Sequence, residues 1–237
     1  MIPEQEHLPR NGRPESLPKL MSQIFNRSAN TIARVSIIGA ILVISGLFGI
    51  LALVHRSGWN TDQRVFREQP VQFSHERHVG GNGIDCRYCH NGVEKSWYSN
   101  VPAASTCMNC HNQVLKDDPK LALVRESAAT GKPIAWVQLH KTPDFVYFNH
   151  SVHVNRGISC VHCHGPVNKM DEVRHSKSLG MAFCLECHRD PAAKIRPVDQ
   201  VYNLDWQAPE GFAKKEGAKL VKDWNVHPGE SCSVCHR

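Results

Sequence analysis

The chain has 237 residues, a formal net charge of +6, ten cysteines and 15 histidines. All ten cysteines occur in pairs separated by two residues, which argues against a disulfide scaffold because no cysteine is left to bridge distant segments. Outside residues 35–54 no long stretch repeats apolar residues with a period of 2 or 3.6, which argues against large sheets and long amphipathic helices.

The N-terminal part of the chain predicts a tail and a membrane anchor. Residues 1–34 mix Pro, Glu, Arg and Asn with few apolar residues, as in a flexible cytoplasmic tail. Residues 35–54 carry no charge, and as a helix they span about 30 Å, the thickness of the hydrocarbon core of a bilayer. A cleaved signal peptide is the alternative, but its apolar region would be shorter and its leader short and basic. We therefore expect a retained transmembrane helix.

Five copies of the pentapeptide Cys-x-x-Cys-His use every cysteine. In this pattern two thiols add to the vinyl groups of one haem, and the histidine binds its iron, so the sequence predicts five covalently bound c-type haems. A zinc site or a redox dithiol is the alternative for a bare cysteine pair, and neither needs the trailing histidine. The predicted attachment cysteines and proximal histidines are Cys86, Cys89 and His90; Cys107, Cys110 and His111; Cys160, Cys163 and His164; Cys184, Cys187 and His188; and Cys232, Cys235 and His236.

Covalent haem attachment also predicts the compartment, because in bacteria it takes place outside the cytoplasmic membrane. We expect a single-pass protein of the bacterial cytoplasmic (inner) membrane with a periplasmic pentahaem cytochrome c domain at residues 55–237. So many haems must supply much of the buried apolar surface. The predicted fold class is therefore a multihaem cytochrome c of mostly short α-helices and loops wrapped around five haems, with little sheet.

An internal repeat divides this domain. The segment Phe73-Ser-His75-Glu-Arg-His78-Val79 before the first haem motif matches Phe148-Asn-His150-Ser-Val-His153-Val154 before the third. A second haem motif follows in each case, so the chain predicts two dihaem units, at about 73–111 and 148–188, and a fifth haem at 232–236.

The repeat also supplies candidates for the distal side of the irons. Histidines at i and i+3 project from nearby faces of one helical turn, so each of the pairs His75/His78 and His150/His153 can bind two neighbouring haems. His140 is the fifth histidine candidate. Met181 stays open, because a thioether ligand would raise the potential of its haem but the side chain can also simply pack on a porphyrin face.

The basic charge does not predict a nucleic-acid partner. Five haems bring ten propionates, so the net charge becomes about +1 when oxidised and about −4 when reduced.

Several of these segments together carry a resemblance. They are the two Phe-x-His-x-x-His-Val repeats with their haem motifs, the stretch from Met181 to Arg189, and the stretch from Arg196 to Trp206. Residues 34–237 resemble the membrane-anchored pentahaem cytochrome c subunit of bacterial alternative complex III, a quinol:electron acceptor oxidoreductase. The resemblance implies quinol-binding membrane subunits and an iron–sulfur subunit as partners, contact with membrane lipid, and a cytochrome c or terminal oxidase as acceptor. It also implies that Met181 is an iron ligand.

The leading functional hypothesis is an electron-carrier subunit with no catalytic site of its own, relaying electrons through the five haems. The alternative is a small membrane-anchored multihaem quinol dehydrogenase that feeds a periplasmic reductase. A multihaem enzyme such as a nitrite or hydroxylamine converter would need an open or lysine-ligated haem, and the five identical motifs argue against it.

Covalent attachment can be tested directly. Because thioether bonds survive acid, acidic acetone should leave all haem on the protein, and the double substitution C107A/C110A should lower the haem content by one. Haem is counted by the pyridine haemochrome assay. Extraction of all haem into the acetone would exclude covalent attachment.

Overall fold

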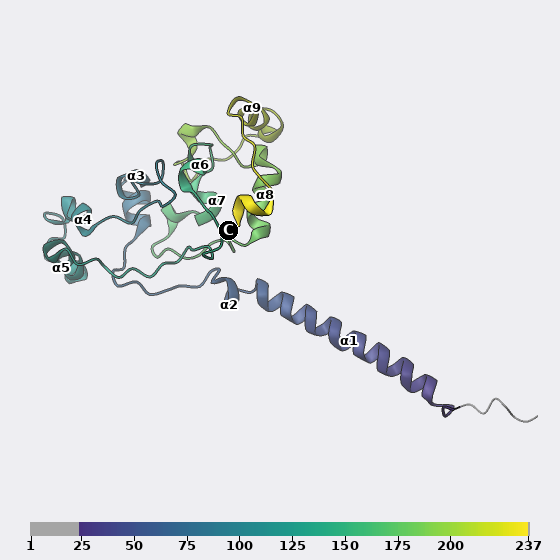
Figure 1. The fold of residues 1–237 in the computed structure, drawn as a ribbon. Coiled ribbons are helices and arrows are strands. Elements are labelled where there is room, and N and C mark those ends of the chain that lie inside the picture. Colours follow the sequence, from purple (N-terminus) through teal and green to yellow (C-terminus); the bar gives the residue numbers. More distant parts are fainter. Residues whose placement is uncertain (1–23, 237) are drawn as a thin grey trace, which may run out of the picture. The chain divides into compact units, whose positions relative to one another are not determined.

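The computed structural model describes residues 24–236 of the chain. This part falls into two units, one ending at Ala52 and one starting at Leu53. Each is described by itself below, with helices labelled as in Figure 1.

The first unit is dominated by one long helix, α1 (Ala29–Arg56), of 28 residues. It contains no buried residue, and its most apolar window has a mean hydropathy of 2.8. By length and composition it can cross a membrane, and a signal sequence near an N-terminus would have the same properties. α1 begins before the apolar stretch: residues 29–34 are its first turns, because helical hydrogen bonds continue into Asn30 and Thr31. Residues 1–23 of the predicted tail lie outside the described part.

The second unit consists of short helical segments joined by long loops (Figure 1). In the described residues no strand occurs, and the only bridge of β type joins Val146 and His236, as expected for a fold with little sheet. The segments are α2 (Gly58–Thr61), η1 (Glu76–Gly81), α3 (Cys86–Cys89), α4 (Ala104–His111), η2 (Pro119–Leu121), α5 (Ala122–Thr130), α6 (His150–Val154), α7 (Cys160–His164), η3 (Val167–Lys169), α8 (Met181–Arg189), η4 (Pro191–Ala193), η5 (Val198–Gln200), η6 (Phe212–Lys214), α9 (Glu216–Asp223) and α10 (Cys232–Cys235).

Every Cys-x-x-Cys-His motif coincides with one of these helices, namely α3, α4, α7, α8 and α10. Each of these helices is preceded by a residue in extended conformation; before α3 this is Asp85, whose carboxylate accepts a hydrogen bond from the Arg87 amide. Cysteines at i and i+3 of a helical turn lie on the same face. The local fold therefore presents both thiols of each motif toward one group.

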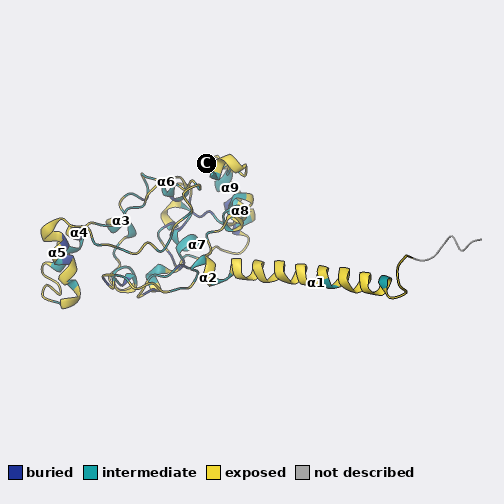
Figure 2. Ribbon diagram, turned by 60° about the horizontal axis from the view of Figure 1, so that its bottom comes forward, coloured by how far each residue is buried: buried dark blue, intermediate teal, exposed yellow. Residues whose placement is uncertain are grey.

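The protein itself forms little core. The second unit has two small clusters of buried side chains, one around Val71, Ala104 and Val124 and one around Val93, Val154 and Val201. Most of the ribbon is exposed or half-buried, with a buried patch on α5 (Figure 2). A domain of this size normally buries a far larger apolar surface, so another apolar component must complete the interior.

Two glycines at equivalent positions of the repeat provide a test of packing. Gly83 and Gly157 both have positive φ, 66° and 80°, which costs a residue with a Cβ atom about 1–2 kcal/mol. A Cβ atom at Gly83 would meet nothing within 4 Å, whereas at Gly157 it would overlap the carbonyl oxygen of Arg196 and approach Trp224 to 2.9 Å. G157A should therefore lower the free energy of unfolding by about 2 kcal/mol more than G83A, measured by denaturation of the haem-loaded protein. Equal losses would show that the second repeat is not packed as described.

Candidate haem-binding site

One continuous cavity runs through the second unit. Its volume is about 2950 Å³, whereas a pocket for one small ligand has about 300–1,000 Å³. Its lining includes all ten cysteines and all five motif histidines, together with His75, His78, His140, His150, His153 and Met181. The cavity is thus large enough for several cofactors and is bordered by every predicted attachment residue.

The histidines before the first and third motifs face motif histidines across this cavity. In each repeat the first histidine of the pair is nearly parallel to the ring of the first motif, and the second is tilted against the ring of the second motif. The distances between ring centroids are 6.4 Å for His75 and His90, 6.1 Å for His78 and His111, 6.3 Å for His150 and His164, and 6.3 Å for His153 and His188.

These distances fit one metal ion between two imidazoles. A bond of about 2.0 Å from each nitrogen to the metal, with about 1.1 Å from each nitrogen to its ring centre, places two centroids about 6.2 Å apart. Among the described residues no group of three or more His, Cys, Asp or Glu side chains is arranged around a metal position. Pairs of histidines therefore fit an iron whose other four ligands belong to a porphyrin.

Hydrogen bonds orient six of these eight rings. A backbone carbonyl oxygen can only accept, so the Nδ1 atom facing it carries the proton and Nε2 keeps the lone pair that binds a metal. The Nδ1–H groups donate as follows: His78 to Ser74 (2.7 Å), His90 to Asn100 (2.7 Å), His111 to Val114 (2.9 Å), His150 to Trp97 (2.8 Å), His153 to Asn149 (2.7 Å) and His188 to Gly229 (2.8 Å).

Burial keeps several of the rings neutral, as a ligand to iron must be. It lowers the pKa of His75 to about 4, with smaller contributions from His90 and His78. It lowers the pKa of His164 to about 3, chiefly by burial and then through His140. The pKa values of His150 and His153 are also lowered, again chiefly by burial.

The remaining candidates lie differently. The His140 ring is edge-on to His164 at 4.4 Å and to His175 at 4.9 Å, closer than the four facing pairs. The ring next to His236 is that of Phe145, with centroids 5.8 Å apart. Met181 is 66% exposed at the start of α8, one turn before Cys184.

His175 is a buried residue that no sequence motif marks. It is 6% exposed, its Nδ1–H donates to the Thr61 carbonyl at 3.0 Å, and its Nε2 is buried without a hydrogen-bond partner among the described residues. A contact over 114 positions leaves no local pattern, so no sequence signal could have found it.

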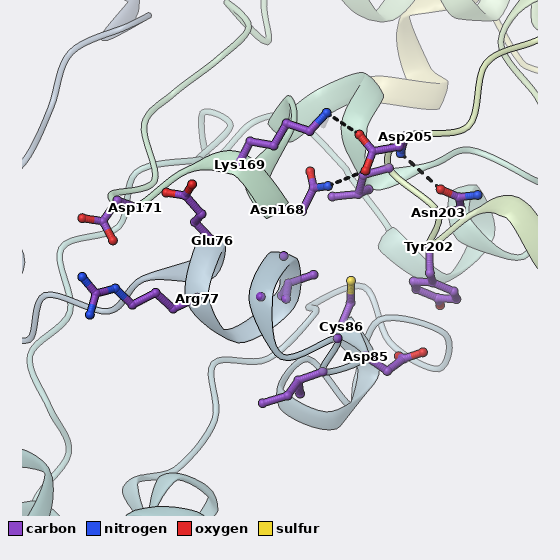
Figure 3. A pocket seen from close by; sticks show the side chains of 16 residues that line it. Glu76, Arg77, Asp85, Cys86, Asn168, Lys169, Asp171, Tyr202, Asn203 and Asp205 are labelled. Carbon is purple, nitrogen blue, oxygen red and sulfur yellow. Dashed lines mark hydrogen bonds and ion pairs between the residues drawn. The ribbon is translucent and has the colours of Figure 1, made fainter. Parts of the chain in front are cut away.

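A second, polar cavity of about 990 Å³ adjoins the first motif (Figure 3). Asp205 lies at its rim, held by Lys169 at 2.5 Å and by the Asn168 amide at 2.9 Å. The Cys86 side chain borders both cavities, so this cysteine stands where the polar surface meets the large cavity.

Comparison with known proteins agrees with this site. Residues 71–130 match the family model described as cytochrome c7 and related cytochrome c. Over 182 residues, 72% of this chain and 78% of the relative, the sequence is 37% identical to the multihaem cytochrome c subunit of menaquinone reductase from Nitratidesulfovibrio vulgaris. The chain therefore belongs to the multihaem cytochrome c family. The predicted class, an electron-transferring cytochrome with covalently bound c-type haems, is confirmed.

The facing pairs make a prediction about ligation. Replacing His153 by alanine removes the ring opposite His188 and should leave one iron open, so the reduced protein should bind about one carbon monoxide per molecule. His227 is hydrogen-bonded to Asn225, and in the described part of the chain no motif histidine ring is paired with it. It provides the matched control, because H227A should bind no carbon monoxide beyond the unaltered protein. Equal binding by the two variants would show that His153 is no ligand.

Proposed function

We propose that this chain is the electron-transfer subunit of a membrane-bound quinone oxidoreductase, and that it carries five c-type haems. The four facing histidine pairs are the observation that carries the proposal. Bound between two imidazoles, a haem supplies one-electron chemistry without a free position for substrate.

The residues around the cavity serve this role by fixing the ligands. Backbone carbonyls hold six rings with Nε2 toward the cavity. Irons with six fixed ligands would suit an electron relay. Because the ligands would not rearrange, the reorganisation energy of each electron transfer would be small. A catalytic site on this chain is not needed.

A haem held by His236 would need a distal ligand from outside the four histidine pairs. Met181 and His140 are the two candidates. His140 already lies edge-on against His164, whereas Met181 is exposed, and Cys184, one turn further along α8, lies near Cys235 of the last motif. We therefore favour Met181 and a haem of higher potential at this position.

We place the protein in the bacterial cytoplasmic membrane, with α1 as the single anchor and the haems on the periplasmic side. The relative from N. vulgaris is named as part of a menaquinone reductase, which supports a quinone as the redox partner of the complex. The resemblance to alternative complex III supports quinol-oxidising membrane subunits, an iron–sulfur subunit, and a cytochrome c or terminal oxidase as acceptor.

A second candidate is a small quinol dehydrogenase in which this chain oxidises quinol itself and feeds a periplasmic reductase. The presence of anchor and haem motifs on one chain favours it.

One experiment separates the two. A quinol analogue is mixed rapidly with the detergent-solubilised chain alone and with the complete membrane complex, and haem reduction is followed by absorbance. We expect fast reduction only in the complex, inhibited by a quinone-site inhibitor. Equally fast reduction of the isolated chain would favour the second candidate.

A further inference from the structure

The two motifs of the first repeat touch each other through their own loops. Tyr88 lies inside the first motif and Asn109 inside the second, and the Asn109 amide donates to the Tyr88 hydroxyl at 3.0 Å. The turn that carries His75 and His78 faces both motifs. We name each attachment site by its motif histidine. Because the two motifs are hydrogen-bonded and one turn faces both, the His111 site and the His90 site are neighbours.

The first repeat meets the second through the His90 site. The segment that follows this motif binds α6: the Trp97 carbonyl accepts from the backbone amide and from Nδ1–H of His150, at 3.3 and 2.8 Å, and the Ser96 carbonyl accepts from Ser151 at 3.2 Å. Val93 of this segment shares a buried cluster with Val154 and Val201.

The attachment cysteines meet at the same junction. The side chains of Cys86 and Cys160 lie next to each other. The first cysteine of the His90 site and the first cysteine of the His164 site are therefore in direct contact. The His111 site lies away from this junction, because its helix α4 packs on α5 in a separate cluster around Ala104 and Val124.

The second repeat continues into the C-terminal motif. The turn with His150 and His153 faces the His164 and His188 sites. His188 donates to the Gly229 carbonyl at 2.8 Å, and Arg189 pairs with Glu230 at 3.3 Å, both just before the last motif. The His188 site is thus the neighbour of the His236 site.

We infer that the five attachment sites stand in single file in the order His111, His90, His164, His188, His236. The inference rests on the proposed function for the haems themselves. The order departs from the sequence at its start, because the two repeats meet through the first site of each. The His111 and His236 sites are the two ends, so redox partners must reach the relay at the loops around these two motifs.

Removal of single haems tests the order. The experiment uses full-length holoprotein with C86A/C89A, which lacks the His90 site, and C107A/C110A as the matched control, which lacks an end of the file. A light-triggered reductant injects less than one electron per molecule, and its redistribution among the haems is followed by absorbance. In C86A/C89A four haems remain, and the haem at the His111 site is separated from the other three. About a quarter of the amplitude of the fast electron redistribution should therefore move into a slow phase. C107A/C110A should show no such loss.

If the sites instead stood in the order of the sequence, the slow phase would occur in C107A/C110A and not in C86A/C89A. That result would overturn the inference. If a variant loses more than one haem, the unaltered complex decides by cryo-electron microscopy: the iron of the first repeat closest to the His164 iron should be that of the His90 site, and finding that of the His111 site there would refute the order. A haem count other than five in the unaltered protein would contradict the proposed function instead.

Discussion

The distance between two facing imidazoles is the constraint on which this structure depends. Four pairs of rings lie 6.1–6.4 Å apart, the spacing that one metal ion bound on both sides requires. In each repeat a single turn carries two of the four histidines that face motif rings, so under the proposed ligation one turn of backbone would position two irons. Because the two rings of a turn are three residues apart, the sites that they serve must be neighbours. One His-x-x-His turn and the two Cys-x-x-Cys-His motifs that it faces would therefore make up one dihaem unit.

The same constraint explains why the chain has so little core of its own. Its two buried clusters are small, while the cavity between the histidines measures about 2950 Å³. Porphyrin faces would fill that space with apolar surface, and the ligand bonds would link loops that otherwise make few contacts. Haem binding would therefore contribute much of the free energy of folding. The protein chain itself acts mainly to hold the imidazole rings and the thiols in place.

Local patterns predicted much of this arrangement. The Cys-x-x-Cys-His motifs and the repeated His-x-x-His turns are short, so the sequence alone indicates the class, the repeat and the role of each turn in two sites. Which rings face each other could not be predicted, because the facing partners are 14 to 35 residues apart and are brought together by folding. The junction was also hidden: the Trp97 carbonyl and His150 are 53 positions apart, and neither residue belongs to a pattern that names the other. The first residue of α1 could not be predicted either, because composition marks where apolar residues begin rather than where a helix does.

The facing imidazoles thus connect the fold to the proposed function, because irons bound between two histidines would suit electron relay better than substrate chemistry. Near-infrared magnetic circular dichroism of the fully oxidised protein tests this claim most directly, because its charge-transfer bands report the pair of axial ligands at each low-spin iron. We expect four irons with two histidine ligands each and a fifth with a different distal ligand. Fewer than four bis-histidine irons would contradict it.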